Sequence, residues 1–453
     1  MNSNSSSLEA IARFFKFGEL QTNLRIEIIA GVTTFMTMAY ILIANPFILS
    51  EAIFLQTSGD LFGELIIATA LASALATLVM GLYAKYPFAL APGMGLNAYF
   101  SFSVVLKLGI PWRVALAAVL IEGLIFIALT LSNIRTQIVA AIPEGIKHAV
   151  AAGIGFFIAY IALTGTKIII ASEATTTTLG NLNDPIVLIT IVGILITSAL
   201  IVRRVTGALL LGILATAGLG WILGIAPWPQ GIIGLPPFPV HLFGQGIIGL
   251  KQVLEVNFLQ LFTITFVFLF VDLFDTVGTL TGLGMKAGYI NRFGEFPRVK
   301  EAFMADAVGT TTGAILGTST VTTYIESASG ISEGGRSGFT AVIVAILFTI
   351  SIFFIPLISG IPGFATAPAL IIVGVLMMGS VKYIRWDDPA ESIPAFLTIF
   401  MMPLSYSIAD GLAIGLITYP VIKSCQGKFN ETNITMWILA VIFVLKFVFV
   451  GKE

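Results

Sequence analysis

Two carboxylates stand at the end of an apolar run in the segment Phe270-Val271-Asp272-Leu273-Phe274-Asp275-Thr276-Val277-Gly278-Thr279. A third, Glu326, stands in a polar segment between Gly317 and Gly330. An aspartate at the centre of a membrane helix costs about 2.5–3.5 kcal/mol, so three acids facing lipid would cost on the order of 10 kcal/mol. They must instead face a protein interior or a wet cavity. This predicts a substrate or ion site; a buried structural network is the alternative.

The composition places these acids in a membrane protein. Of the 453 residues, 57% are hydrophobic and 10% are charged, whereas soluble proteins have about 25% charged residues. The mean hydropathy is +1.00. The net charge of −1 gives no basis for nucleic-acid binding, and the single cysteine, Cys425, excludes an intrachain disulfide. No metal-ligand spacing and no cofactor motif is present, so we expect no metal and no cofactor.

Fifteen segments are candidates to cross the membrane. Thirteen are apolar runs and two, at 88–106 and 317–330, are broken by Gly, Pro and polar residues; the thirteen runs are 27–49, 64–84, 112–131, 145–164, 186–202, 206–224, 257–281, 300–316, 338–359, 366–381, 391–407, 408–424 and 434–450. Most basic loops, including the one at 286–300, follow even-numbered segments. This predicts a multi-pass protein of the cell membrane with a cytoplasmic N-terminus.

The segment order predicts an inverted repeat. We expect a cytoplasmic segment at 1–24, in which 1–7 are disordered and 8–17 form a surface helix. A first seven-segment repeat follows at 25–224, then an extracytoplasmic loop at 225–256, and a second repeat with a C-terminal run at 257–453. The broken segments are third in each repeat, and such matched interruptions point to the binding site of a transporter.

Each broken segment is predicted to contain an extended stretch followed by a half-helix. Pro92, Gly93 and Gly95 cluster in the first, so a half-helix should start near Gly95 and carry Asn97. In the second, 314–317 should be extended, a half-helix should start near 319 or 320, and Glu326 should lie on it. The two N-termini would face one pocket. An ordinary surface loop is the alternative for the Pro-Gly cluster.

The spacing of Asp272 and Asp275 predicts that they share a helix face with Thr276 and Thr279. Both acids should not ionise together in low dielectric, so at least one should hold a proton. A carboxylate that takes up and releases a proton suits a proton-coupled carrier. Asp306, inside the ninth apolar run, is expected to make a helix–helix polar contact. Tyr40 is a candidate for the pocket wall.

Three motifs together resemble one family. Residues 270–279, residues 91–98 (Ala-Pro-Gly-Met-Gly-Leu-Asn-Ala) and residues 318–327, which include Tyr324 and Glu326, resemble the AzgA-like branch of the nucleobase–cation symporter-2 family (nucleobase–ascorbate transporters). The resemblance covers nearly the whole chain. It implies an all-α fold of seven plus seven inverted segments, with core and gate domains and elevator-like alternating access. It also implies proton-coupled import of hypoxanthine, guanine or adenine, and a homodimer through the gate domain.

The resemblance also implies site residues. Asp272, Asp275 and Glu326 match the family's binding carboxylates and are expected to couple protons, and Asn97 matches its important asparagine. The other expected substrate contacts are Thr276, Thr279, Thr323 and Tyr324. The uracil and xanthine branches have Glu and His in the eighth segment, where this chain has Asp275 and Thr279, so uracil and xanthine are less favoured.

The chemistry of these residues suits a purine. A carboxylate accepts two parallel N–H bonds, half-helix N–H groups can donate to a carbonyl or ring nitrogen, and an adaptable amide such as Asn97 could serve all three bases. The main alternative is a sulfate/bicarbonate-type anion transporter of the same fold, although three acids would repel an anion. A channel and a membrane enzyme are other classes; the chain has no nucleophile–base pair that would make it an enzyme.

Overall fold

The computed structural model describes residues 3–132, 142–290 and 296–449. Nine helices within these ranges are long and apolar enough to cross a membrane. Shorter or broken helices occupy the other segments that hydropathy predicts. Residues 291–295 of the predicted basic loop lie outside the described residues, as do residues 1–2, 133–141 and 450–453.

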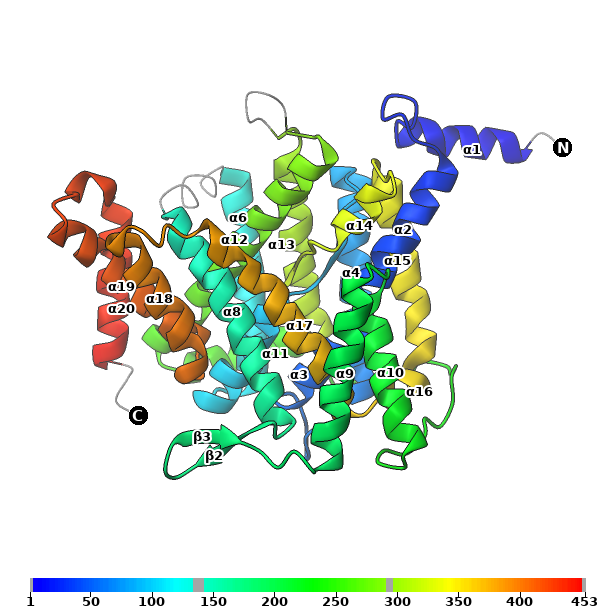
Figure 1. Ribbon diagram of the computed structural model, residues 1–453. Coiled ribbons are helices and arrows are strands. Elements are labelled where there is room, and N and C mark those ends of the chain that lie inside the picture. The colour runs from blue at the N-terminus through cyan, green and yellow to red at the C-terminus, as the bar shows by residue number, and fades with distance from the viewer. Residues whose placement is uncertain (1–2, 133–141, 291–295, 450–453) are drawn as a thin grey trace.

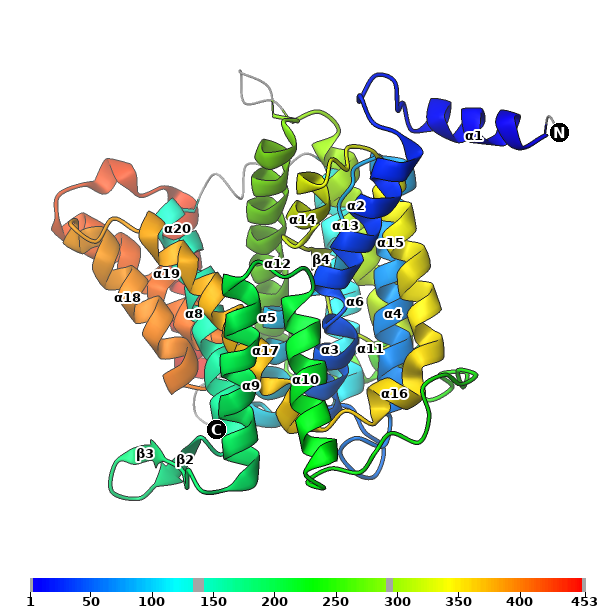
Figure 2. The ribbon, with the colours of Figure 1, turned by 45° about the vertical axis from the view of Figure 1, so that its right-hand side comes forward.

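The helices form two groups, and each group takes helices from both halves of the chain (Figures 1 and 2). The core group contains α2 (Leu24–Met38), α3 (Ile41–Ser50), α4 (Phe62–Val79), α5 (Met94–Ala98), α6 (Trp112–Ser132), α11 (Gln245–Gln252), α12 (Phe258–Ala287), α13 (Val299–Leu316), α14 (Ser327–Ser332), α15 (Gly338–Ser351) and α16 (Ile355–Ser359). The gate group contains α8 (Glu144–Gly165), α9 (Pro185–Val202), α10 (Ala208–Ile222), α17 (Ala367–Met378), α18 (Pro389–Leu404) and α19 (Ile408–Cys425).

Two short strands cross at the centre of the core group. β1 (Leu90–Pro92) and β4 (Val321–Thr323) are antiparallel, and Ala91 is paired with Thr322. All six strand residues are buried. Extended backbone at membrane depth must find hydrogen-bond partners inside the protein. Here the two broken segments supply them to each other, which fixes the relative position of the third and tenth segments.

The first half-helix is confirmed and the second is corrected. α5 begins at Met94, one residue from the predicted start. The predicted extended stretch at 314–317 is wrong, because α13 continues to Leu316 and ends where Gly317 adopts φ +94°. The chain is then extended to Thr323, and α14 begins only at Ser327. The hydroxyl-bearing and β-branched residues between these points favour extended backbone.

The remaining elements lie at the periphery. α1 (Ser3–Phe14) is helical from Ser3, so the predicted disorder of 1–7 is wrong for residues 3–7. A hairpin of β2 (Ile169–Ser172) and β3 (Thr176–Leu179), which we did not predict, lies on the opposite face of the molecule from α1 (Figure 1). After α19 the chain forms a further helix, α20 (Ile434–Phe449), against α19 and α12.

Candidate functional site

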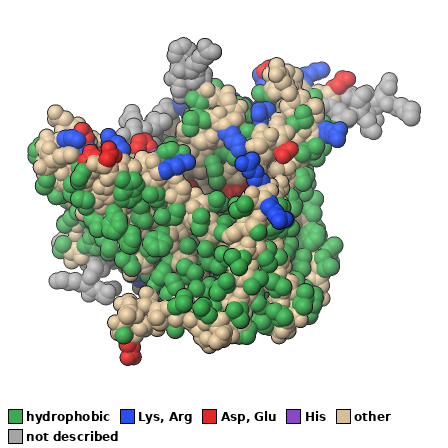
Figure 3. All heavy atoms as spheres, viewed as in Figure 1, with side chains coloured by type: hydrophobic (Ala, Val, Ile, Leu, Met, Phe, Trp, Pro, Cys, Tyr) green, Lys and Arg blue, Asp and Glu red, His purple; other side chains and the backbone are tan. Residues whose placement is uncertain are grey.

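A hollow between the two helix groups contains recessed acidic side chains (Figure 3). Asp275 of α12 is exposed, and Glu326, which directly precedes α14, is half-buried. Ile325 is 54% exposed and lies 3.7 Å from the position that a Cβ atom on Gly282 of α12 would occupy. We call the space lined by Asp275, Ile325 and Glu326 the crevice. It brings together one acid from each of the two predicted segments.

Asp275 and Glu326 come from neighbouring parts of the core group, because Ile325 approaches α12 at Gly282. Tyr40, at the junction of α2 and α3, donates its hydroxyl hydrogen to Glu326 Oε1 over 3.2 Å. A bound proton, or a ligand N–H donated to the acids, would offset the negative charge that two carboxylates bring to the crevice. The crevice therefore suits a neutral ligand that has N–H groups.

Asp272 and Asp275 are neighbours around α12, but the prediction that both point at one pocket is not met, because only Asp275 is exposed. Asp272 is fully buried. The hydroxyl of Thr276 lies 3.2 Å from Asp272 Oδ1, 2.9 Å from Asp306 Oδ2 and 2.9 Å from the Thr322 hydroxyl. Asp306 Oδ1 also accepts from the backbone N–H of Thr323 over 3.1 Å. We call Asp272, Thr276, Asp306, Thr322 and Thr323 the interior network.

The interior network places one hydroxyl between two acids. Thr276 has one hydroxyl hydrogen, and the Thr322 hydroxyl can donate to the Thr276 oxygen. The Thr276 hydrogen can bond fully to one of the two acids or be shared between both. The network also confirms the predicted helix–helix contact of Asp306, since it joins α13 to α12 and to β4.

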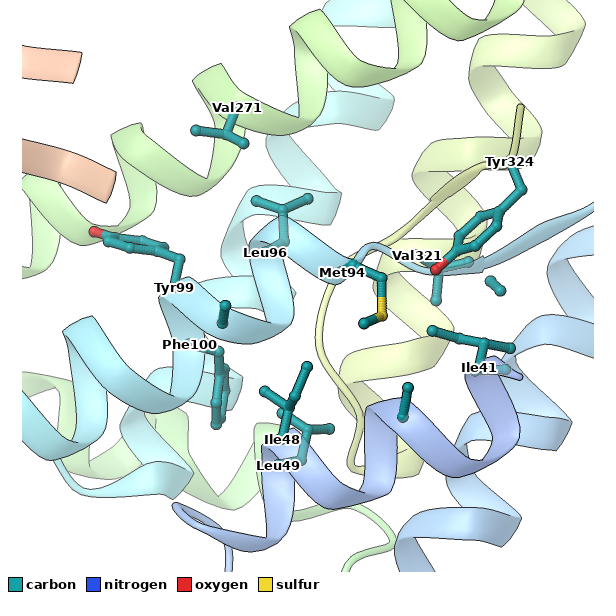
Figure 4. Packing of buried hydrophobic residues seen from close by; sticks show 14 of the residues in the cluster. Ile41, Ile48, Leu49, Met94, Leu96, Tyr99, Phe100, Val271, Val321 and Tyr324 are labelled. Carbon is teal, nitrogen blue, oxygen red and sulfur yellow. The ribbon is translucent and has the colours of Figure 1, made fainter. Parts of the chain in front are cut away.

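Asn97 and Tyr324 hold the strand crossing. The Tyr324 hydroxyl donates to the carbonyl of Pro92 over 2.5 Å, and Met94, Val321 and Ile41 lie around its ring (Figure 4). Tyr324 was predicted to contact the substrate. Its ring is buried, so a ligand cannot stack on it in this conformation. Thr279, another predicted substrate contact, is half-buried on α12.

The Asn97 amide is fully buried on α5. Its oxygen accepts from the Ser319 hydroxyl, while its nitrogen has no hydrogen-bond partner within the described part of the chain. A buried donor left without an acceptor costs about 1–3 kcal/mol. This amide nitrogen is therefore a donor that an added acceptor would satisfy.

Sequence reasoning missed Glu122. This residue lies inside α6, is fully buried, and accepts from the Thr320 hydroxyl through Oε2 over 2.7 Å. The signal was present, since Glu122 is the only acid in the apolar run 112–131. Its partner could not be found in the same way, because Thr320 is almost 200 residues further along. Among the residues that the structure describes, no group of three or more His, Cys, Asp or Glu side chains could hold a metal ion.

Comparison with solved structures supports the architecture. The transmembrane domain of a cyanobacterium bicarbonate transporter, BicA, has a TM-score of 0.61 at 14% identity, covering 86% of this chain and 97% of that one. SLC26A9 has a TM-score of 0.63 at 10% identity, covering 94% of this chain and 70% of that one. These neighbours share the fold of seven plus seven inverted segments, which is therefore the fold of this chain.

Sequence comparison identifies the family. A family described as "Permease family" matches residues 25–414. The guanine/hypoxanthine permease PbuG of Bacillus subtilis is 48% identical over 96% of this chain and 99% of its own length. The adenine permease AdeP of Escherichia coli is 41% identical over 98% of this chain and 97% of its own length. The chain therefore belongs to this permease family, the nucleobase–cation symporter-2 family, as its three motifs predicted.

Proposed function

We propose that the chain imports purine nucleobases together with protons. The observation that carries the proposal is the presence of Asp275 and Glu326 at the crevice of a chain whose relatives include guanine/hypoxanthine and adenine permeases. A purine presents ring N–H groups to these acceptors and offers a flat face to the crevice wall. Neutral bases also avoid the repulsion that an anion would meet there.

The proposed proton carriers are Asp272, Asp275 and Glu326. The crevice holds two carboxylates, so a proton bound to one of them lowers the negative charge and favours binding of the base beside it. Asp272 belongs to the interior network, where it and Asp306 share the Thr276 hydroxyl. Thr276 connects the residues behind the crevice to the strand that leads to Glu326.

We further propose that the core group moves relative to the gate group during transport. Lys107, at the end of the third segment, donates to Asp410 of the gate group over 2.9 Å and to the Ser405 carbonyl over 2.8 Å. These contacts lie where α18 turns into α19, on the β2–β3 side of the molecule (Figure 1). They close that side, so this is the conformation open towards α1. With a cytoplasmic N-terminus, it is the inward-open one.

Other features of the proposal follow from the segment order. We place the two repeats at 25–224 and 257–453, the N-terminus in the cytoplasm, and the protein in the cell membrane as a homodimer through the gate group. An anion carrier of the bicarbonate type shares the fold, but the recessed carboxylates disfavour it.

Uptake of labelled hypoxanthine by cells that lack purine uptake tests the proposal. We expect uptake that a proton uncoupler abolishes and that unlabelled guanine or adenine blocks, with uracil and xanthine less effective. Glu326→Gln should abolish uptake, and Asp275→Asn should weaken the apparent affinity for hypoxanthine, while membrane abundance stays unchanged. If a protein shown to be in the membrane takes up neither hypoxanthine nor adenine, the purine assignment is wrong. Bicarbonate and sulfate uptake, measured in parallel, would then identify an anion carrier.

A further inference from the structure

Three consecutive hydroxyl side chains follow Gly317 and precede β4. Each is hydrogen-bonded to a different helix of the core group: Thr318 accepts from Asn45 of α3 over 3.0 Å, Ser319 donates to Asn97 of α5, and Thr320 donates to Glu122 of α6 over 2.7 Å. All six side chains are fully buried. The position of Ser319 is therefore fixed by contacts on both sides of it along the chain.

The backbone holds Asn97 in register with the same stretch. The N–H of Gly93 donates to the Thr320 carbonyl over 2.9 Å, and the N–H of Asn97 donates to the Gly93 carbonyl over 2.8 Å. A Cβ atom on Gly93 would lie 2.9 Å from the Thr322 side chain, so only glycine allows this close approach. The Ser319 hydroxyl and the Asn97 amide consequently meet in one fixed arrangement.

The geometry points to Ser319 as a specificity-determining residue, which selects purines that have an oxygen at C6 by holding the Asn97 amide oxygen, so that the amide N–H is the group left for the base. This inference rests on the proposed function. Ser319 donates to the amide oxygen, so that oxygen faces Ser319 and the amide nitrogen is left without a partner in the described residues. A partnerless N–H requires an acceptor. Hypoxanthine and guanine offer a C6 carbonyl, whereas adenine has an amino group there, which also donates.

Ser319 acts through Asn97 and need not touch the base. If its hydroxyl is removed, the amide is free to rotate, and either end can face the ligand. Hypoxanthine then loses its preorganised donor, while adenine gains access to the amide oxygen. The discrimination between the two bases should therefore fall, which a purely structural role for Ser319 would not cause.

Competition against labelled hypoxanthine measures this discrimination as the ratio of the inhibition constants of adenine and hypoxanthine. We expect a ratio of at least tenfold in the unaltered protein. In Ser319→Ala the ratio should fall at least fivefold, and in Ser319→Thr, which keeps a hydroxyl, it should stay within twofold. Ser101→Ala is the matched control, because the Ser101 hydroxyl is also buried but has no hydrogen-bond partner among the described residues.

Asn97→Asp is the second variant, for the case that Ser319→Ala is not inserted into the membrane. It replaces the partnerless amide N–H by an acceptor of the same shape, so hypoxanthine binding should weaken at least tenfold and adenine binding should weaken less. An unaltered ratio in Ser319→Ala, or an unaltered protein that prefers adenine, would overturn the inference while the proposed function stands. An absence of all purine uptake and binding would overturn both.

Discussion

Asp272 and Asp275 are three residues apart on α12, yet they belong to different environments. Asp272 is fully buried in the interior network, and Asp275 is exposed in the crevice. Three residues correspond to about 60° around a helix, which is enough to cross the boundary between interior and crevice. Two acids of one motif can therefore have different roles. The contacts of Asp272 hold the core group together, whereas Asp275 is open to a ligand. Substitutions on the two sides should separate stability from transport.

The largest effect is expected from Asp306→Ala in the interior network. It removes the acceptor of the buried Thr323 N–H and a partner of Thr276, each worth about 1–3 kcal/mol when left unsatisfied. We expect loss of uptake together with an apparent Tm in detergent that is lower by on the order of 5 °C. An unchanged Tm would show that the network contributes little to stability.

Asp275→Asn, on the crevice side, should lower the apparent affinity for hypoxanthine about 10- to 100-fold, as expected when a hydrogen bond to a charged group is lost. The Tm should stay within about 2 °C of the unaltered protein, because an exposed side chain leaves no buried partner unsatisfied. Saturation kinetics of uptake measure the apparent affinity, and thermal unfolding of the same variant measures the Tm. A Tm as low as that of Asp306→Ala would remove the distinction between the two sides.

Thr276→Val keeps the side-chain shape and removes only the hydroxyl that contacts both interior acids. We expect a loss of about 1–3 kcal/mol of stability, because the carboxylates lose a donor. Thr279→Val is the matched control one turn further along α12, where the side chain is only half-buried. Equal Tm losses in the two variants would contradict a special role for Thr276.

The smallest effect is expected from Tyr40→Phe, which removes one hydrogen bond to Glu326 and leaves the ring in place. A single bond of this kind contributes about 0.5–1.5 kcal/mol, so the apparent KM for hypoxanthine should rise about two- to tenfold. The Tm should not change. A loss of uptake as complete as that of Glu326→Gln would instead give Tyr40 a direct part in coupling.

The sequence predicted the segments better than their contacts. Hydropathy located each of the nine long apolar helices of the described residues and predicted that two segments are broken, because lipid permits only helices there unless the protein satisfies the backbone. It placed the second break too early, since α13 could have ended at several residues before Gly317. It also could not separate Asp272 from Asp275, because the boundary between them is made by Thr322 and Asp306 from distant segments. The partner of Glu122 was hidden for the same reason.

The pairing of β1 with β4 also sets an order for biosynthesis. Ala91 pairs with Thr322, which is translated roughly 230 residues later, on the order of 10 to 50 s at typical rates of synthesis. Until then the extended backbone of residues 90–92 has no strand partner, although hydrocarbon tolerates no such segment. The first half of the chain therefore cannot complete its third segment by itself. The newly made protein must keep that segment sheltered, at the insertion machinery or in water, until the tenth arrives.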